Sequence, residues 1–460
     1  MVYTRRDIWD LENEQPWHPV TLAYAKAINS MNDGYPATDP RSWTYQAAIH
    51  GVPTGTPLEP GWDQCEHADW FFLPWHRMYL FYFESIVRKI VLAQGGPEDW
   101  ALPYWNYDGG GSKNTIPLPF REEWLPGPPG VANPLYVQDR DDGINDGSEP
   151  LQSSITSPAQ ALATTIFSPP PRPTFGGGRL DQGGPFGNPG RLEGTPHNDI
   201  HNAIGGLMGD PATAGLDPIF WLHHANIDRL WNRWTDDPNH VPPTDNSWRN
   251  QQYGFFDENA DPQAKRSKDV LSTVTQLDYR YDDDPLPFEE VERVPREPVR
   301  RRPPAELVAA TEEPTRLVGR PVSVPVAVDE RVDVRRLRNE MAETRRVVLS
   351  VEHLDAEVNP GVVYGVYLEG LGRDEPVHVG NVSLFGIERL HRRQGVEEAH
   401  DLRLDFDVTE AVGGQVDKLR DVKVRFAPIR LNAESRRRLA EEATEAHPPI
   451  EVGRVSFSVD

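Results

Sequence analysis

The sequence has only one cysteine among 460 residues, and this scarcity excludes several classes of protein. A single thiol cannot form a disulfide framework within the chain, nor supply the cysteine pairs of a zinc ribbon. No run of 18 apolar residues occurs, so no segment is predicted to cross a membrane. The first residues, MVYTRRDIWDLENEQPW, lack the apolar stretch of an export signal, although they contain a twin arginine. We therefore expect a cytoplasmic protein, with export by another route left open.

Basic residues are also few in proportion to acidic ones. The chain has 47 Lys and Arg against 71 Asp and Glu, a net charge of −24. Such an acidic surface argues against nucleic acids or anionic membranes as partners. The hydrophobic content of 37% is enough for a substantial core, and the length suits two domains.

The first part of the chain has the pattern of a compact helical domain rich in aromatic residues. All 13 tryptophans lie within the first 248 residues. Apolar spacing and proline in the first turn predict helices over 19–31, 74–93, 195–204 and 217–235. Thr195 and Asp217 are the expected N-caps of the last two helices. The stretches 108–135 and 168–191, rich in Gly, Pro and Ser, are predicted to be long loops, and the domain is expected to span 1–284.

The second part has a different composition and a different period. Residues 285–345 are rich in Pro, Glu and Arg and are predicted to form an extended linker. Its basic run Arg300–Arg302 is either a protease target or a solvated cluster. From 346 to 460 the sequence alternates with a period of two, in segments such as GVVYGVYLEG and DVKVRFAPIRL. This predicts an all-β sandwich or barrel.

The histidines fall into two groups that suggest metal binding. The first group is His50, His67 and His76, and the second is His197, His201 and His224, with His223 beside the last. On a helix, His197 and His201 share one face at chelating distance. The neighbours His223 and His224 point about 100° apart, so one is expected to bind metal and the other to support it.

Two clusters of imidazole on facing helices indicate a coupled pair of metal ions. All-imidazole sites suit copper, zinc, iron or nickel. The chain lacks the cysteine pairs of a zinc site and the carboxylate-rich set of a di-iron bundle. A structural or zinc-binding protein is the alternative outside redox chemistry.

Long segments around these histidines resemble one family. HADWFFLPWHRMYLFYFE and DPIFWLHHANIDRLW resemble the two copper signatures of the tyrosinase, catechol oxidase and molluscan haemocyanin family, and PHNDIH resembles the start of the second copper region. The resemblance covers about residues 17–281 and ends at Tyr279-Arg280-Tyr281, which resembles the tyrosine motif of plant relatives. LDFDVTEAV and VVYGVYLEG resemble strands of the C-terminal domain of plant polyphenol oxidases and haemocyanins. The fold implied is a mainly α catalytic domain, a four-helix bundle around a dicopper site with long loops, followed by the all-β domain.

The resemblance implies a ligand set for two copper ions. The first copper would be bound by His50, His67 and His76, with His18 as the only other upstream candidate for the place of His50. The second would be bound by His197, His201 and His224, since the second histidine of the His223–His224 pair matches the family's ligand. The spacing Cys65-Glu66-His67 implies a thioether between Cys65 and His67, and the alternative is an unmodified buried thiol.

Other positions near the ligands acquire expected roles from the same resemblance. Glu193 and Asn198 would hold a water that takes the phenolic proton, although Glu193 could equally be a loop carboxylate or a helix cap. Phe220 would pack against the ligands, and Asn202 would face the substrate entrance. Met208 and Pro211 would lie in the loop that gates the second copper.

Asp228 has two interpretations that the sequence leaves open. It either accepts a hydrogen bond from the ring nitrogen of a ligand histidine, or forms an Asp–Arg pair with Arg229 or another arginine.

The implied function is a copper-dependent phenol oxidase that uses O2 to ortho-hydroxylate monophenols and to oxidise o-diphenols to o-quinones. Small phenolic molecules would be its substrates. The C-terminal domain would be either a stable partner domain or a plug, with Leu384 and Phe385 of SLFGI as the plug residues and activation by cleavage within 285–345. The alternatives are a catechol or o-aminophenol oxidase without monophenolase activity and a haemocyanin-like oxygen carrier.

Overall fold

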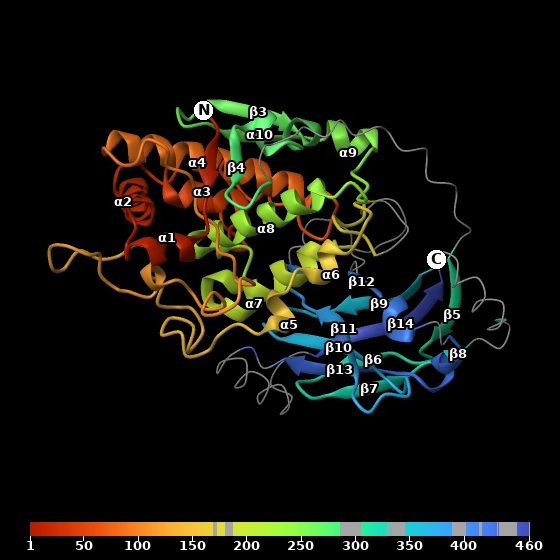
Figure 1. Cartoon of the computed structure of the whole chain (residues 1–460). Helices are drawn as coiled ribbons and strands as arrows, with labels where there is room; N and C mark the ends of the chain where they lie inside the picture. The colour runs from red at the N-terminus through yellow and green to blue at the C-terminus, as the bar shows by residue number, and fades with distance from the viewer. Residues whose placement is uncertain are drawn as a thin grey trace.

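The computed structural model describes residues 1–168, 173–179, 187–285, 305–328, 332, 346–388, 402–413, 416–429, 431 and 449–459. Its helical part comes from the first 285 residues, and its sheets come mainly from residue 306 onward. Figure 1 shows the helical part above the two larger sheets, with α5 (Ser153–Thr156) and α7 (Asp199–Ile204) beside β10 (Val363–Glu369) and β11 (Val377–Val382).

The helices predicted from the sequence form, with two differences at their ends. α2 spans Pro19–Asp33, and α8 spans Pro218–Asp236, where the Asp217 side chain caps the helix by accepting from the Ile219 backbone N–H. α4 (Phe72–Ala93) begins before the predicted proline. The helix predicted over 195–204 is divided into the π-helical turn η2 (Glu193–Asn198) and α7. Thr195 is extended (φ −133°, ψ 123°) and directly precedes Pro196, as expected for an N-cap, but its hydroxyl donates to Asp199 Oδ2 instead of accepting from a backbone N–H.

The helical part is packed around aromatic side chains from α4 and α8. Phe83 and Trp221 stack with their ring centroids 3.4 Å apart, and this contact joins the two longest helices. α2 packs on α4 from the other side. The remaining elements of this part are α1 (Ile8–Glu14), α3 (Trp43–His50), α6 (Ala159–Leu162), α9 (Asn246–Asn250), α10 (Thr273–Leu277), η1 (Leu118–Phe120), η3 (Gly206–Gly209), η4 (Ala214–Leu216), η5 (Ser267–Val270), and the hairpin β2 (Gln252–Phe256) and β3 (Pro262–Arg266).

The two ends of the helical part meet in a short parallel pair of strands. β1 (Tyr3–Arg5) lies beside β4 (Tyr279–Tyr281), with Arg5 opposite Tyr281 in the register. β4 coincides with the tyrosine motif noted in the sequence. The pairing therefore ties the start of the chain to the end of the predicted catalytic domain.

The strand-rich part consists of two sheets that share one core. The first has the order β11–β10–β13–β7, and the second has the order β12–β9–β14–β5–β8, with β6 added beside β14. Leu349 of β9, Val366 of β10 and Phe457 of β14 belong to one buried cluster, so the sheets face each other as a sandwich. The elements are β5 (Glu306–Ala310), β6 (Thr315–Leu317), β7 (Val322–Pro325), β8 (Ala327–Val328), β9 (Val347–Asp355), β12 (Leu402–Asp407), α13 (Thr409–Val412), η6 (Val416–Asp421), β13 (Lys423–Ile429) and β14 (Ile450–Val459).

The predicted linker needs correction for residues 306–328. β5, β6 and β8 belong to the second sheet and β7 to the first, so this stretch completes the sandwich instead of connecting to it. The physical reason is that Val308 and Leu317 bury their side chains in the sandwich core despite the surrounding prolines and charges. The basic run Arg300–Arg302 lies outside the described residues.

Candidate metal centre

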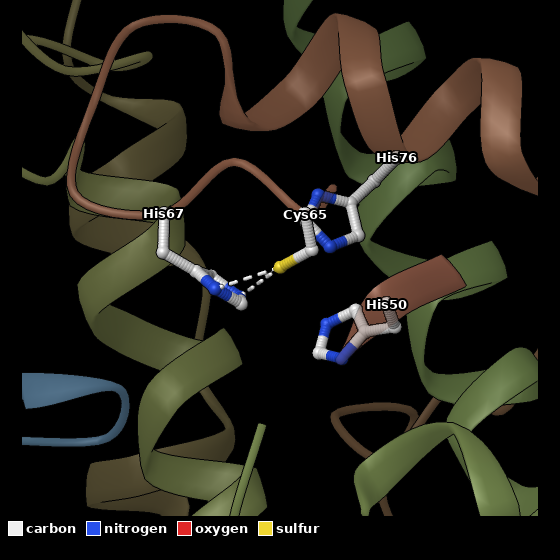
Figure 2. Close-up of side chains that lie close together, drawn as sticks. All are labelled: His50, Cys65, His67 and His76. Atoms are coloured by element: carbon white, nitrogen blue, oxygen red, sulfur yellow. Dashed lines mark hydrogen bonds between the residues drawn. The ribbon is translucent and has the colours of Figure 1, made fainter. Parts of the chain in front are cut away.

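The first histidine group converges on one point of the helical part. His50 is the last residue of α3, His67 lies in the loop before α4, and His76 lies in the first turns of α4. One ligand atom from each of these histidines and from Cys65 lies within 4.8 Å of the others, and all four residues are buried. Figure 2 shows the three rings and the thiol facing a common space.

The second group converges in the same way. His197 comes from η2, His201 from α7, and His223 and His224 from α8. One ligand atom from each of the four lies within 4.8 Å of the others. His201 Nε2 and His224 Nε2 are 3.4 Å apart, while His197 Nε2 has no hydrogen-bond partner. Buried nitrogens in such an arrangement suit a shared cation better than hydrogen bonds to one another.

Four of these histidines are anchored through Nδ1, which leaves Nε2 for a metal. Nδ1 of His50 lies 2.7 Å from the Pro211 carbonyl oxygen, and Nδ1 of His201 lies 2.7 Å from that of Met208. His76 uses the Phe72 carbonyl at 2.8 Å, and His197 uses Asn198 Oδ1 at 2.8 Å. Each oxygen is an acceptor, so Nδ1 carries the proton and the lone pair is on Nε2. The donor set therefore fits metal ions without rearrangement.

The two groups lie against each other and form one centre. The rings of His76 and His224 stack with centroids 4.5 Å apart and an interplanar angle of 9°. His67 and His197 are 5.6 Å apart by the same measure. Phe220 fills the space between the groups, 4.8 Å from His50 and 4.2 Å from His224. This is the packing position expected for Phe220 from the sequence.

Burial keeps the imidazoles of the second group neutral. It lowers the pKa of His197 to about 3, even though Asn198 favours the charged form. Burial also lowers the pKa values of His201 and His224 well below the ordinary range, and neighbouring imidazoles add to the effect. Neutral imidazole is the form that binds a metal ion. An all-nitrogen donor set of this kind suits copper.

His223 is closer to the second group than the sequence indicates. Its ring lies 5.3 Å from that of His197 with a 21° interplanar angle, and 5.0 Å from that of His201. The other side of the His223 ring faces Tyr107 at 5.7 Å, a contact that no spacing in the sequence could indicate.

Cys65 lies against the His67 ring, as the Cys-x-His spacing suggests. Its Sγ is 2.9 Å from Nδ1 and 3.7 Å from Nε2, the two nitrogens that flank ring carbon Cε1. The thiol is fully buried. Figure 2 shows the sulfur directed at this ring and not at His50 or His76.

Glu193 and Asn198 connect the loops of the two groups. Glu193 is 2% exposed, and its Oε1 accepts from the Ala68 backbone N–H at 2.5 Å, next to His67 in the chain. Asn198 uses its side-chain oxygen to hold His197, so its NH2 group is directed elsewhere. Glu193 thus lies in a buried turn between both groups and does not cap a surface helix.

The predicted plug segment reaches the centre through one of its two residues. The Phe385 ring stacks on His201 with centroids 4.0 Å apart and an angle of 13°, and lies 5.7 Å from His67 and 5.8 Å from His197. Leu384 belongs to the core of the sandwich instead. β11 ends at Val382, and a turn follows in which the Ile387 backbone N–H donates to the Leu384 carbonyl, so the chain changes direction between these two residues.

The gating loop contributes backbone as well as side chains. Met208 is buried, and its carbonyl oxygen anchors His201, while the Pro211 carbonyl anchors His50. Asn202, which was expected at the substrate entrance, is 1% exposed and contacts the sandwich.

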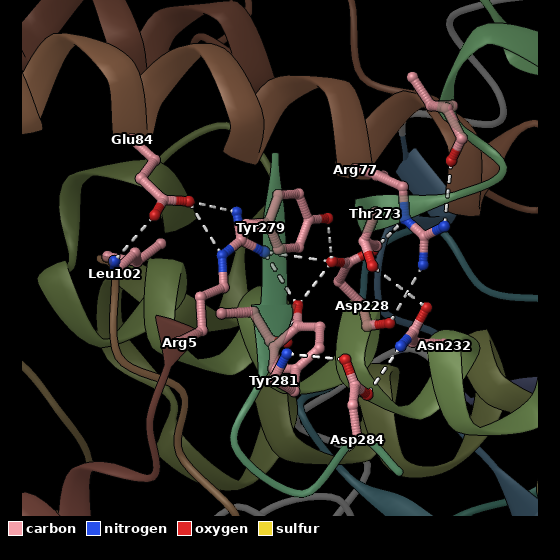
Figure 3. Close-up of polar contacts among 12 residues, drawn as sticks. Arg5, Arg77, Glu84, Leu102, Asp228, Asn232, Thr273, Tyr279, Tyr281 and Asp284 are labelled. Carbon is pink, nitrogen blue, oxygen red and sulfur yellow. Dashed lines mark hydrogen bonds and ion pairs between the residues drawn. The ribbon is translucent and has the colours of Figure 1, made fainter. Parts of the chain in front are cut away.

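Asp228 forms an Asp–Arg pair, but not with Arg229. Its carboxylate contacts Arg77 and Arg5, as Figure 3 shows, while Arg229 pairs with Asp283. Arg77 follows His76 on α4 and Asp228 lies on α8, so this pair joins two helices that carry histidines.

Two adjacent groups of buried imidazoles in a helical frame define a dinuclear copper protein. Residues 40–237 match the common central domain of tyrosinase, and residues 243–294 match the polyphenol oxidase middle domain. Residues 304–459 match a domain of unknown function. Tyrosinase HcTyr1 of Hahella sp. (strain CCB-MM4) is 30% identical over 99% of this chain and 98% of its own length. The chain belongs to the tyrosinase family and is a copper-dependent phenol oxidase with two copper ions.

Other relatives show the fold and its variety. The latent chloroplastic polyphenol oxidase of Prunus armeniaca is 30% identical over 59% of this chain and 48% of its own length. The structure of latent aurone synthase matches all of this chain and 89% of its own, with a TM-score of 0.64 at 22% identity. It therefore confirms a fold with a C-terminal β-rich domain.

The location of the protein stays a prediction. Among the described residues, no helix is both long and apolar enough to cross a membrane. The plant relatives are named as chloroplastic, which concerns those proteins and gives no support to the cytoplasmic location expected above.

Proposed function

We propose that this enzyme uses O2 to ortho-hydroxylate monophenols and to oxidise o-diphenols to o-quinones. The observation that carries the proposal is the place of the Phe385 ring, flat on His201 and near His67 and His197. A phenol ring has the same size and shape as this side chain, so the space in front of the two histidine groups suits a small phenol. The copper pair would supply the redox chemistry with O2.

Six histidines would hold the copper ions, three for each. Those of the first copper are His50, His67 and His76, and those of the second are His197, His201 and His224, each offering a nitrogen to the shared space. We assign the four-helix bundle to α3, α4, α7 and α8, since each carries one of these histidines. The proposed catalytic domain is 1–284, and the sandwich is the second domain.

Glu193 is the group best placed to receive the phenolic proton. It is buried between the loops of the two histidine groups, and one of its oxygens is held by Ala68 N–H. A fixed carboxylate beside a reacting hydroxyl acts as a general base, directly or through a water. The NH2 group of Asn198 could position that water, because its oxygen is already engaged by His197.

A thioether between Cys65 and His67 belongs to the same proposal. Its formation joins Sγ to a ring carbon, removes one hydrogen from each partner and transfers two electrons to an oxidant, for which O2 is available to this enzyme. The 2.9 Å separation of Sγ from His67 Nδ1, which is bonded to ring carbon Cε1, supports this bond. A covalent tie would restrict the rotation of His67 and keep its lone pair directed at the first copper.

The enzyme would be latent while its C-terminal domain is in place. Phe385 occupies the space that a phenol would need, and cleavage in the part of 285–345 that precedes β5 would allow the domain to leave. Most of that segment lies outside the described residues.

The decisive experiment compares the wild-type full chain with Phe385→Ala, both loaded with copper. We expect two copper ions per chain by elemental analysis, and oxygen uptake with tyramine and catechol that is higher for the variant. Uptake with catechol alone would favour a catechol or o-aminophenol oxidase. Reversible oxygen binding without substrate oxidation would favour a haemocyanin-like carrier, and absence of copper would contradict both.

A further inference from the structure

The sandwich contacts the second copper region through two asparagine side chains and one serine, which meet α7 and the carbonyls of Ser154 and Gly209. We propose that Asn359, Asn381 and Ser383 form a latch that holds Phe385 over the histidines and that can open without cleavage of the chain. We call these three residues the amide latch. The expected effect on catalysis rests on the proposed function. The latch itself is a set of hydrogen bonds between the sandwich and the helical part, and it does not depend on that function.

The first arm of the latch holds both ends of the Asn202 side chain. Asn202 Nδ2 donates to Ser383 Oγ at 2.9 Å. Asn359 Nδ2 donates to Asn202 Oδ1 at 2.9 Å and to the Gly209 carbonyl at 3.2 Å. Asn202 is only 1% exposed, so the sandwich provides the hydrogen bonds that this buried amide requires. Asn202 directly follows His201, the histidine on which Phe385 stacks.

The second arm holds the same helix from its other end. Asn381 Nδ2 donates to Asp199 Oδ2 at 2.7 Å and to the Ser154 carbonyl at 2.8 Å. Asn381 Oδ1 is engaged by His378 Nε2 at 2.8 Å, and this contact fixes which end of the amide faces the helical part. Asp199 is fully buried.

The two arms grip α7 at positions that flank His201. Asp199 lies two residues before this histidine and Asn202 one residue after it, while Asn381 and Ser383 precede Phe385 in the chain. The segment that carries Phe385 is therefore joined to α7 both before and after His201. Leu384 anchors the same segment in the sandwich core, so Phe385 leaves only if the domain moves.

The chemistry of the latch makes it reversible. Apart from the contact of Asn381 with the Asp199 carboxylate, the latch consists of hydrogen bonds between neutral groups, which contribute little net stability because water replaces each partner when they separate. On opening, Asn202 and Asn359 would exchange their mutual hydrogen bond for hydrogen bonds to water. Such a contact can be shifted by a small change in free energy, whereas cleavage of the chain is irreversible.

Two substitutions test the latch with almost no change in shape. Asn359→Asp places an oxygen where an NH2 group faces the oxygens of Asn202 and Gly209. Asn381→Asp does the same opposite Asp199 and the Ser154 carbonyl. Each converts two attractive contacts into two repulsive ones, and we expect the open population to rise about tenfold or more.

The control is Asn259→Asp, which makes the same change of charge elsewhere. Asn259 is exposed in the turn between β2 and β3, and its Oδ1 accepts from Lys89. Ser383→Ala is a milder variant that removes only the acceptor for Asn202, in case the aspartates prevent folding. Phe385→Ala removes the plug and leaves all three latch residues unchanged.

The experiment measures backbone hydrogen exchange at 199–209 and 377–385 in the uncleaved, copper-loaded protein, together with catechol oxidation. We expect faster exchange and faster oxidation in the Asn359→Asp, Asn381→Asp and Ser383→Ala variants, and faster oxidation with unchanged exchange in Phe385→Ala. Exchange in the latch variants that matches Asn259→Asp would overturn the latch. Faster exchange without oxidation in any variant, Phe385→Ala included, would support the latch and contradict the proposed function.

Discussion

Replacing Asp228 by Asn should destabilise the helical part more than any other change of a single charge that we consider. The Asp228 carboxylate is 3% exposed and contacts Arg77 and Arg5. It also accepts from the hydroxyls of Tyr279 and Tyr281, both at 2.5 Å. Figure 3 shows that these partners come from α4, β1 and β4, so one carboxylate joins three elements to α8.

The size of the effect follows from the burial of the two arginines. Arg5 is 0% exposed and Arg77 is 1% exposed, so neither can turn to water when Asp228 loses its charge. Glu84 is the other counter-charge of Arg5, with its Oε2 2.9 Å from Nε, but it makes no contact of this kind with Arg77. Removing one partner of a buried ion pair costs about 3–5 kcal/mol. The amide has nearly the same volume as the carboxylate, so this loss reflects charge and not a cavity.

The assay is urea unfolding followed by tryptophan fluorescence. All 13 tryptophans lie before residue 249, so the signal reports the helical part. We expect a lower midpoint for Asp228→Asn with little change of slope. Arg77→Met in the same chain should restore part of the loss, because it removes the uncompensated cation.

The matched control is Asp283→Asn. Asp283 Oδ2 lies 2.5 Å from Arg229, but the Asp283 side chain is 34% exposed, so water screens this pair and it should contribute less than the pairs of Asp228. A midpoint for Asp228→Asn no lower than that of Asp283→Asn would refute the reasoning, since burial would then make no difference to the two pairs.

Three further predictions concern pH, covalent chemistry and catalysis. Burial alone would raise the pKa of Asp228, but Arg77 and Arg5 outweigh it and hold the pKa below its usual range. The stability that Asp228 contributes is therefore complete above its unfolded pKa near 3.8 and is lost as the pH falls through the lower folded value. The difference in the urea midpoint between wild type and Asp228→Asn should be constant from about pH 5 to 8 and shrink in stronger acid. A difference that grows on acidification would contradict this. Peptide mapping of the copper-loaded enzyme should find the peptide with Cys65 and His67 two hydrogens lighter than its sequence, and a thiol that can be alkylated after unfolding would count against the thioether. In the Phe385→Ala background, Glu193→Gln should lower the rate of tyramine oxidation by about 10²-fold or more and the rate of catechol oxidation much less. Equal losses on both substrates would show that Glu193 is not the general base for the phenolic proton.

The elements that sequence reasoning found are those with a strong local signal. α4 and α8 combine long apolar spacing with aromatic side chains, and Asp217 caps α8 as its position before a proline predicts. Of the candidate ligands, His76 and His224 lie on these two helices, and His197 and His201 lie within the helix predicted over 195–204. His50 lies on α3, which the apolar pattern did not predict, so its place was expected from the family resemblance alone.

What the sequence could not show depends on contacts between distant segments. β5 and β7 lie among prolines and charges, and their strand character comes from pairing with β14 and β13 far along the chain. β14 itself pairs with β9 and β5 at the centre of its sheet. Asp228 selects Arg77 and Arg5 over its neighbour Arg229 because the helix directs adjacent side chains to different faces.

The loop from Met208 to Pro211 shows how the two copper sites and the sandwich are coupled. Its carbonyls orient one histidine in each group, His201 and His50. Between these two residues, the Gly209 carbonyl accepts from Asn359 of the sandwich. The backbone of this loop thus contacts one histidine of each group and one residue of the latch. Opening the latch would free this loop at the same time as it withdraws Phe385, so the change should reach the orientation of the ligands as well as access to them.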